Sequence, residues 1–344
     1  MRPADQTRHY TVWLGGARVG TAVETERWSY RGVTLRRTET MRFLRGDAPI
    51  TLVTTIVIEA NAALVPSSMS WTEEGPALRR ADAIREDGRW TIRARDRDGN
   101  LDRGELVTLP DDAVPAELMP LLTRRDGHFA GRVFLPARGF LLGHGRVEPA
   151  APGRLVARLT LDGGAVAEAT IDIDQDGGYT RIVDGEGVIA SQVSAVHAAV
   201  PFEPVDLIAA TAIPITGPRS GSHLVIDGDM ALPPVPGQHA RPARAGIELS
   251  LSSRLPGALP DEARGPDRSG EIRDLVTAVR ASIVPDLATG PTTAKQAAAA
   301  TAGDCTTFAL AYAAHAARRA IPTRVVTGLR VDGDRLIRHR WAVS

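Results

Sequence analysis

Polar and apolar residues alternate along the chain from about residue 10 to residue 210. The alternation is clear in residues 33–43, 50–59, 154–161 and 166–173. A period of two residues is typical of strands that bury one face. Pairs such as Gly15-Gly16 separate these segments and are common turns between antiparallel neighbours. The pattern predicts an antiparallel β domain over residues 1–212, with one short helix within residues 110–122.

The composition changes after residue 212. Residues 213–268 are rich in proline, glycine, serine and arginine, and we interpret them as a bridging segment. Helical spacing returns in residues 271–284, where apolar residues recur every three or four positions. Another helix is predicted for residues 306–320, and two strands follow it. Residues 269–344 are therefore predicted to form a second domain.

The charge balance and the composition narrow the range of partners. Basic and acidic residues each number 41 in 344 residues, so no net field favours nucleic acid. No run of about 20 apolar residues is present, so no membrane span is predicted. We find no phosphate loop and no metal-spaced histidine and cysteine set, and predict neither a cofactor nor a metal. Residues 172–177 match the opening of a calcium loop, but an acidic hairpin turn explains them better.

Cys305 is the only cysteine in the sequence. It follows Gly303-Asp304 at the start of a predicted helix, where unpaired N–H groups and the helix dipole stabilise a thiolate. Asp304 is the predicted N-cap. His339 lies on a predicted strand further along, and a cysteine on a helix with a histidine on a strand is typical of a nucleophile and its base. The alternative is a small buried cysteine without a chemical role.

The residues around this pair resemble a known family. The turn Gly303-Asp304-Cys305, the segment from Arg318 to Leu329 and the His-x-Trp pattern at His339 are similar to the core of the bacterial transglutaminase-like superfamily. The resemblance implies an α+β fold, in which an N-terminal antiparallel β-sheet domain precedes a partial papain-like transglutaminase core. It implies Cys305 as the nucleophile and His339 as the base. It also favours a periplasmic or secreted location, although the chain as given carries no signal peptide.

The chain departs from the family pattern in three places. Thr307 and Val343 stand where the family has glutamate, and the family's third catalytic residue, an aspartate on the next strand, would lie beyond Ser344. We therefore expect a core that is cut short after the His-x-Trp strand. The predicted function is cysteine-dependent acyl transfer on amide groups of a protein or peptide, of the peptidase, amidase or transglutaminase type. The alternative is an inactive domain of this kind that serves as a binding or structural module.

Overall fold

The computed structural model describes residues 3–76, 79–95, 109–136, 140–162, 166–175, 177–185, 187–215, 223–226, 238–244, 246–251, 267–288 and 294–344. The chain forms two compact units, Met1–Asp206 and Leu207–Ser344. Strands make up 58% of the described structure and helices 19%. The predicted α+β class with a papain-like core is therefore wrong, because the molecule is mostly β and its largest element is a single sheet.

The first unit is built on a sheet of 14 described strands. Neighbouring strands are antiparallel except for the parallel pair β8 and β9. Strand β1 lies between β2 and β14 in the order β7-β6-β5-β4-β3-β2-β1-β14-β13-β12-β11-β10-β9-β8. The strands are β1 (Gln6–Leu14), β2 (Ala17–Trp28), β3 (Gly32–Arg45), β4 (Ala48–Asn61), β5 (Pro66–Glu74), β6 (Arg79–Glu86), β7 (Arg89–Arg95), β8 (Val114–Pro115), β9 (Phe129–Leu135), β10 (Leu141–Ala151), β11 (Arg154–Leu161), β12 (Val166–Ile173), β13 (Tyr179–Asp184) and β14 (Val188–Val193).

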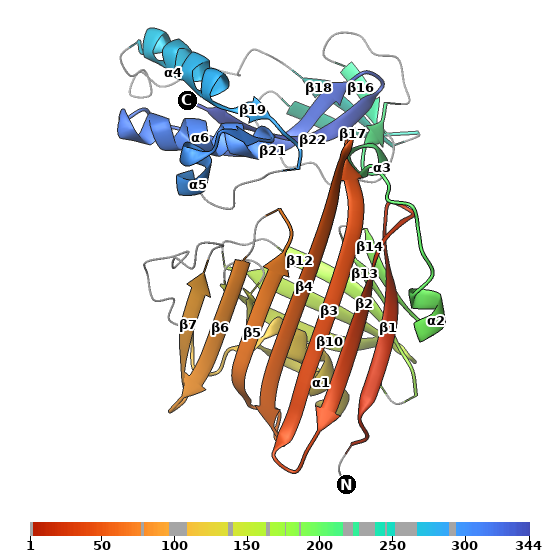
Figure 1. Ribbon diagram of the computed structural model, residues 1–344. Coiled ribbons are helices and arrows are strands. Elements are labelled where there is room, and N and C mark those ends of the chain that lie inside the picture. The colour runs from red at the N-terminus through yellow and green to blue at the C-terminus, as the bar shows by residue number, and fades with distance from the viewer. Residues whose placement is uncertain are drawn as a thin grey trace. The chain divides into compact units, whose positions relative to one another are not determined.

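The sheet curls around a short helical segment. In Figure 1 the strands β10 to β14 lie behind β1 to β5, with helix α1 (Met119–Asp126) between the two layers. The 3-10 helix η1 (Ala116–Leu118) leads directly into α1, so the predicted short helix is present, and it extends past residue 122 to Asp126. One apolar cluster joins Ile58 and Trp71 of the front strands to Leu121 of α1 and Phe134 of β9. Helix α1 therefore packs against the inner face of the curled sheet.

Most of the predicted strands are confirmed within one to three residues. The turn between β1 and β2 contains Gly15 and Gly16 with φ of 59° and 80°, which suits the two-residue hairpin that their sequence predicts. Strand β5 was not predicted, because it begins at Pro66 and is mainly serine, threonine and glutamate. Strand β14 was missed as well. Helix α2 (Ala195–Ala198) ends this unit.

The second unit combines smaller sheets with three longer helices. Its described elements are α3 (Leu207–Ala210), β15 (Ile213–Pro214), β16 (His223–Ile226), β17 (Gln238–Ala243), β18 (Gly246–Leu251), α4 (Ser269–Ser282), β19 (Val284–Pro285), α5 (Ala294–Ala299), β20 (Ala302–Gly303), α6 (Cys305–Arg318), β21 (Arg324–Asp332) and β22 (Arg335–Val343). Helices α4 and α6 pack together through Leu275, Val279 and Tyr312. Much of the predicted bridging segment 213–268 lies outside the described residues.

Helix length bears on the predicted partners. None of the helices in the described ranges is long and apolar enough to cross a membrane.

Candidate functional site

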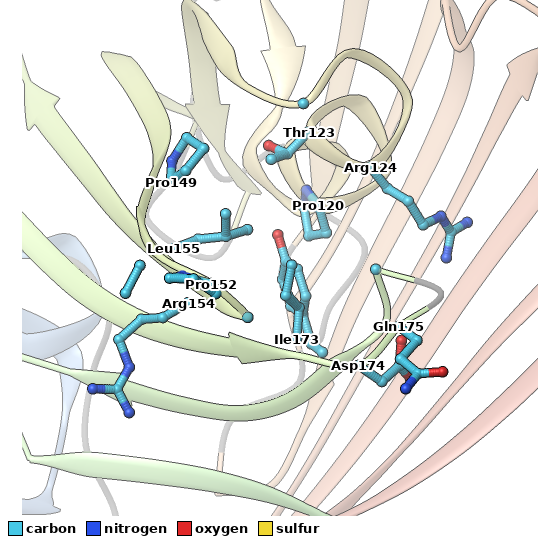
Figure 2. Close-up of a pocket in the computed structure, with 15 residues that line it drawn as sticks. Pro120, Thr123, Arg124, Pro149, Pro152, Arg154, Leu155, Ile173, Asp174 and Gln175 are labelled. Atoms are coloured by element: carbon cyan, nitrogen blue, oxygen red, sulfur yellow. The ribbon is translucent and has the colours of Figure 1, made fainter.

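A pocket of about 460 Å³ lies in the first unit, and we call it the α1 pocket. Three segments form it: helix α1, the turn between β10 and β11, and the turn between β12 and β13. Figure 2 shows Arg124 and Arg154 on opposite sides of the pocket, with Pro120 and Leu155 between them. A volume of this size falls within the range of small-molecule sites. The residues used below are Pro120, Thr123, Arg124, Leu155, Ile173 and Tyr179.

The local sequence of α1 positions its side chains. Pro120 occupies the first turn, where a missing N–H costs nothing. The helix ends at Gly127, whose φ of 78° is left-handed and whose N–H donates to the Thr123 carbonyl oxygen at 2.7 Å. Arg124 therefore lies in the last turn, from which its guanidinium reaches the opposite strands.

Arg124 ends in a buried ion network that closes one side of the pocket. Its two terminal nitrogens donate to Oε1 and Oε2 of Glu26 on β2, at 3.1 Å and 2.5 Å. Arg8 on β1 donates to the same Glu26 Oε1 at 2.6 Å and to Glu24 at 3.4 Å. The side chain of Glu26 is 2% exposed. One carboxylate thus joins the helix to two strands.

The ion network shifts the pKa values of Glu26 and Arg8. Burial alone would raise the pKa of Glu26, but the hydrogen bonds from Arg124 and Arg8 outweigh burial and hold that pKa below its ordinary value. Burial would lower the pKa of Arg8, but Glu26 raises it by hydrogen bonding and charge. The network therefore carries its charges at neutral pH.

Tyr179 supplies a polar group without a partner. Its ring packs with Val147, Leu155 and Ile171, and its backbone carbonyl accepts a hydrogen bond from the Tyr10 hydroxyl at 3.1 Å. Its own hydroxyl oxygen is buried and makes no hydrogen bond in the described structure. Burial raises the pKa of Tyr179, so the hydroxyl keeps its proton and can donate it to an acceptor. A buried hydroxyl without a partner is uncommon, and it can donate to a ligand that carries an acceptor.

The sequence contained a signal for this network that went unused. Arg8 pairs directly with Glu24, and Glu24 pairs with Arg37, across neighbouring strands. Glu24 and Glu26 share a strand face with the buried Ala22, so acids occupy positions that the alternation assigns to the inside. Charged residues in the apolar phase of a strand pattern are the observation that would have located the site.

Cys305 is the first residue of α6, as predicted. Oδ1 of Asp304 accepts the N–H groups of Thr306 and Thr307 at 2.9 Å and 3.1 Å, which confirms the predicted N-cap. A Cβ at Gly303 would come within 2.0 Å of the Thr307 hydroxyl oxygen, so this position requires glycine for the close approach. Cys305 is a free thiol and half-buried.

His339 lies on β22, opposite Gly328 of β21. Its ring stacks on Trp341 with a centroid separation of 6.1 Å and an interplanar angle of 21°. Burial, and then the positive charge of Arg330, lower the pKa of His339, so the neutral imidazole is favoured.

The structure shows no hydrogen bond between Cys305 and His339, and it places them on different elements, α6 and β22. Ala342 of β22 packs on the cluster that contains Tyr312 of α6, and Ser344 shares a 2.8 Å hydrogen bond with the Tyr312 hydroxyl. Side chains alternate along a strand, so His339 lies on the face opposite to Ala342. No hydrogen bond links the thiol to the imidazole, both of which are described. Their pairing in catalysis stays a prediction.

The acidic turn at residues 172–177 is a hairpin, with Asp176 outside the described residues. Asp174 Oδ1 accepts the Gly178 N–H at 2.7 Å. In the described part of the chain, no group of three histidine, cysteine, aspartate or glutamate side chains could hold a metal ion.

The chain was compared with protein-family models, with curated proteins and with solved structures. No protein-family model matches the chain, and no curated protein matches it. Among solved structures, the chain is similar to a β-barrel-like protein of the domain of unknown function DUF1849 from Brucella abortus, with 12% identity, a TM-score of 0.43, and coverage of 56% of this chain and 97% of that one. It is also similar to a DUF1089 family protein from Pseudomonas aeruginosa, with 13% identity, a TM-score of 0.29, and coverage of 46% and 87%.

These findings correct the family prediction. The chain matches no family model, a transglutaminase-like one included, and its largest described element is a sheet of 14 strands. The predicted membership of the transglutaminase-like superfamily, with its peptidase and papain-like descriptions, is wrong. The local motif has another explanation, because Gly303 fits beneath Thr307 and Asp304 caps a helix. A close backbone approach and a helix cap occur in many unrelated folds, so these two residues do not identify one family.

Proposed function

We propose that the first unit binds a small, largely apolar molecule that carries one hydrogen-bond acceptor. The observation that supports this is the unpartnered, buried hydroxyl of Tyr179 in the wall of a 460 Å³ pocket. Leu155, Ile173 and Pro120 offer apolar contact, and the Tyr179 hydroxyl offers a single donor. Arg124 is paired with Glu26, and Arg154 is paired with Asp172 at 2.8 Å, so both arginines of the pocket already have a carboxylate partner.

Tyr179→Phe tests this proposal, because it removes only the hydroxyl. Ligand-observed NMR with a library of neutral amides and ketones should find binders of the wild type. Tyr179→Phe should bind them about tenfold more weakly, the effect of one hydrogen bond. Tyr30→Phe, at a residue that is 82% exposed, is the matched control and should change nothing. Equal binding by Tyr179→Phe, or no binder at all, would contradict the proposal.

We propose as a second candidate that Cys305 performs acyl transfer on amide groups of a protein or peptide. Its support is the half-buried free thiol at the N-terminus of a 14-residue helix. The acyl group would pass from the amide to the Cys305 sulfur, with loss of the amine, and then to water or a second amine.

Intact-mass measurement after incubation with an activated peptide ester tests the second candidate. An acyl adduct should form on the wild type and not on Cys305→Ser. His339→Ala examines the predicted base, and it should slow both acylation and labelling by iodoacetamide. A thiol that reacts only in denaturant would exclude the acyl-transfer role, and an unchanged rate in His339→Ala would exclude the base.

A further inference from the structure

A second cavity, of about 470 Å³, opens on the other side of the helical segment, and we call it the Glu117 cavity. Glu117 projects from η1, and Arg37 comes from β3. Strands β13 and β14 supply the opposite wall. The residues that the argument uses are Arg37, Glu117, Ile182, Asp184, Val188 and Ala190.

Glu117 brings an unsatisfied charge into this cavity. Its Oε2 atom is buried and accepts no hydrogen bond in the described structure. A buried carboxylate oxygen without a donor is costly, so this atom is an acceptor held ready for one. The unpartnered Glu117 Oε2 atom is the observation that indicates a ligand in this cavity.

The surrounding charges favour a cation. Arg37 is the cationic side chain in the described wall, and it is engaged elsewhere: it donates to Glu39 Oε2 at 3.0 Å and lies 3.9 Å from Glu24 Oε2. Asp184 adds a second carboxylate to the wall and accepts the Val188 N–H at 2.8 Å. The described wall of the cavity therefore holds two acids, Glu117 and Asp184, and one arginine, Arg37.

The chemistry of the walls selects the kind of cation. Ile182, Val188 and Ala190 are aliphatic and suit a hydrocarbon body. A divalent metal would require more ligands, and the described residues hold no group of three suitable side chains. We infer that the Glu117 cavity binds a small organic cation, with a primary ammonium donating to Glu117 Oε2 and a short aliphatic body against β13 and β14.

Binding of the cation should be coupled to the release of a proton from Glu117. Burial raises the pKa of Glu117 to about 7, and a cation would favour the ionised carboxylate and release its proton. Within the cavity, the other charged groups that face Glu117 are Arg37 and Asp184. Glu117 also borders a second, small space of about 10 Å³, whose charged or titratable residues are Arg8, Glu24, Glu26, Arg124 and Tyr179. The carboxylate form rises about tenfold between pH 6 and pH 8, and the apparent affinity should rise by the same factor.

Titration calorimetry of the full chain with cyclohexylammonium tests the inference. The wild type should bind it about tenfold more tightly at pH 8 than at pH 6 and release protons. Glu117→Gln, which keeps the side-chain shape, should lose both the binding and the pH dependence. Glu74→Gln removes the same charge from an exposed position on β5 and should bind as the wild type does.

Cyclohexanol separates charge from shape, since it has the same ring without the ammonium. It should bind at least tenfold more weakly than cyclohexylammonium. Circular dichroism of Glu117→Gln establishes that the variant is folded, and Ala190→Met fills the cavity from the opposite wall as a second test. Equal binding by folded Glu117→Gln, equal binding of cyclohexanol, or no binding by the wild type would overturn the inference.

Discussion

Arg124 donates hydrogen bonds to both carboxylate oxygens of Glu26, at 3.1 Å and 2.5 Å, across 98 residues of sequence. The pair holds helix α1 against β2 at the centre of the first unit. Arg8 shares the same carboxylate, so the removal of Glu26 would leave Arg124 without its counter-charge and Arg8 with only the longer contact to Glu24, at 3.4 Å.

We expect Glu26→Ala to lower the free energy of unfolding by about 3–5 kcal/mol, the cost of breaking a buried ion pair. Urea unfolding followed by circular dichroism measures it. Glu168→Ala breaks an exposed cross-strand pair with Arg158 and should cost less than about 1 kcal/mol. Similar losses in the two variants would contradict the role of Glu26.

The same carboxylate should make the protein sensitive to acid. Its folded-state pKa lies below the ordinary value of 4.5, so its stabilising effect is full above that value and is lost as the pH falls through the folded pKa. Urea midpoints between pH 6 and pH 2.5 should fall more steeply below pH 4.5 in the wild type than in Glu26→Gln. Parallel curves would show that Glu26 is not the titrating group.

Glu117 should have the opposite pH dependence. Its folded-state pKa is about 7 against an ordinary 4.5, so the unfolded chain loses its proton first and stability falls as the pH rises from 4.5 to 7. Glu117→Gln should therefore be more stable than the wild type at pH 8, by about 2–3 kcal/mol. At pH 4 the two proteins should unfold alike. Thermal melts at both pH values check this, with Glu74→Gln as the neutral reference.

The N-cap of α6 can be tested by a pair of variants. Asp304→Ala should cost about 1 kcal/mol, because the N–H groups of Thr306 and Thr307 lose their acceptor. Asp304→Asn keeps a capping oxygen and should stay within a few tenths of the wild type. Chemical denaturation monitored by helix signal distinguishes them. Equal losses would indicate that the charge of Asp304 matters more than the cap.

A fragment of residues 1–206 should fold by itself, since it carries its own sheet and apolar core. We expect a single cooperative transition, with the acid sensitivity of the full chain. A broad transition, or its absence, would show that the second unit is needed for folding.

Local patterns in the sequence predicted local structure well. Alternation located strands such as β11 and β12 to the residue, and the Gly-Asp pair located the start of α6. The predicted fold class is wrong because it relies on Gly303-Asp304-Cys305 as a family signature. A close approach to Thr307 explains Gly303, and a helix cap explains Asp304. Cys305 and His339 each lie on the predicted kind of element, but the face of a strand is set by register, which the sequence motif does not encode.

The partners of the buried charges could not be foreseen in the same way. Glu26 and Arg124 are far apart in sequence, and neither stands in a recognisable motif. Glu117 lies in a short helical segment whose predicted range already contained it, but its burial depends on the sheet that curls around it. Partners of this kind appear only when the long-range pairing of strands is known.

Strand β1 has a consequence for how the chain is made. Thr11 pairs with Thr21 of β2 but also with Ser191 of β14, which is 180 residues further along the chain. A ribosome adding about 5–20 residues per second needs roughly 10–40 s to reach β14. During that time one edge of β1 has unpaired backbone N–H and C=O groups, and such an edge is a template for pairing with other nascent chains. Successful production therefore depends on protecting β1 until β14 emerges.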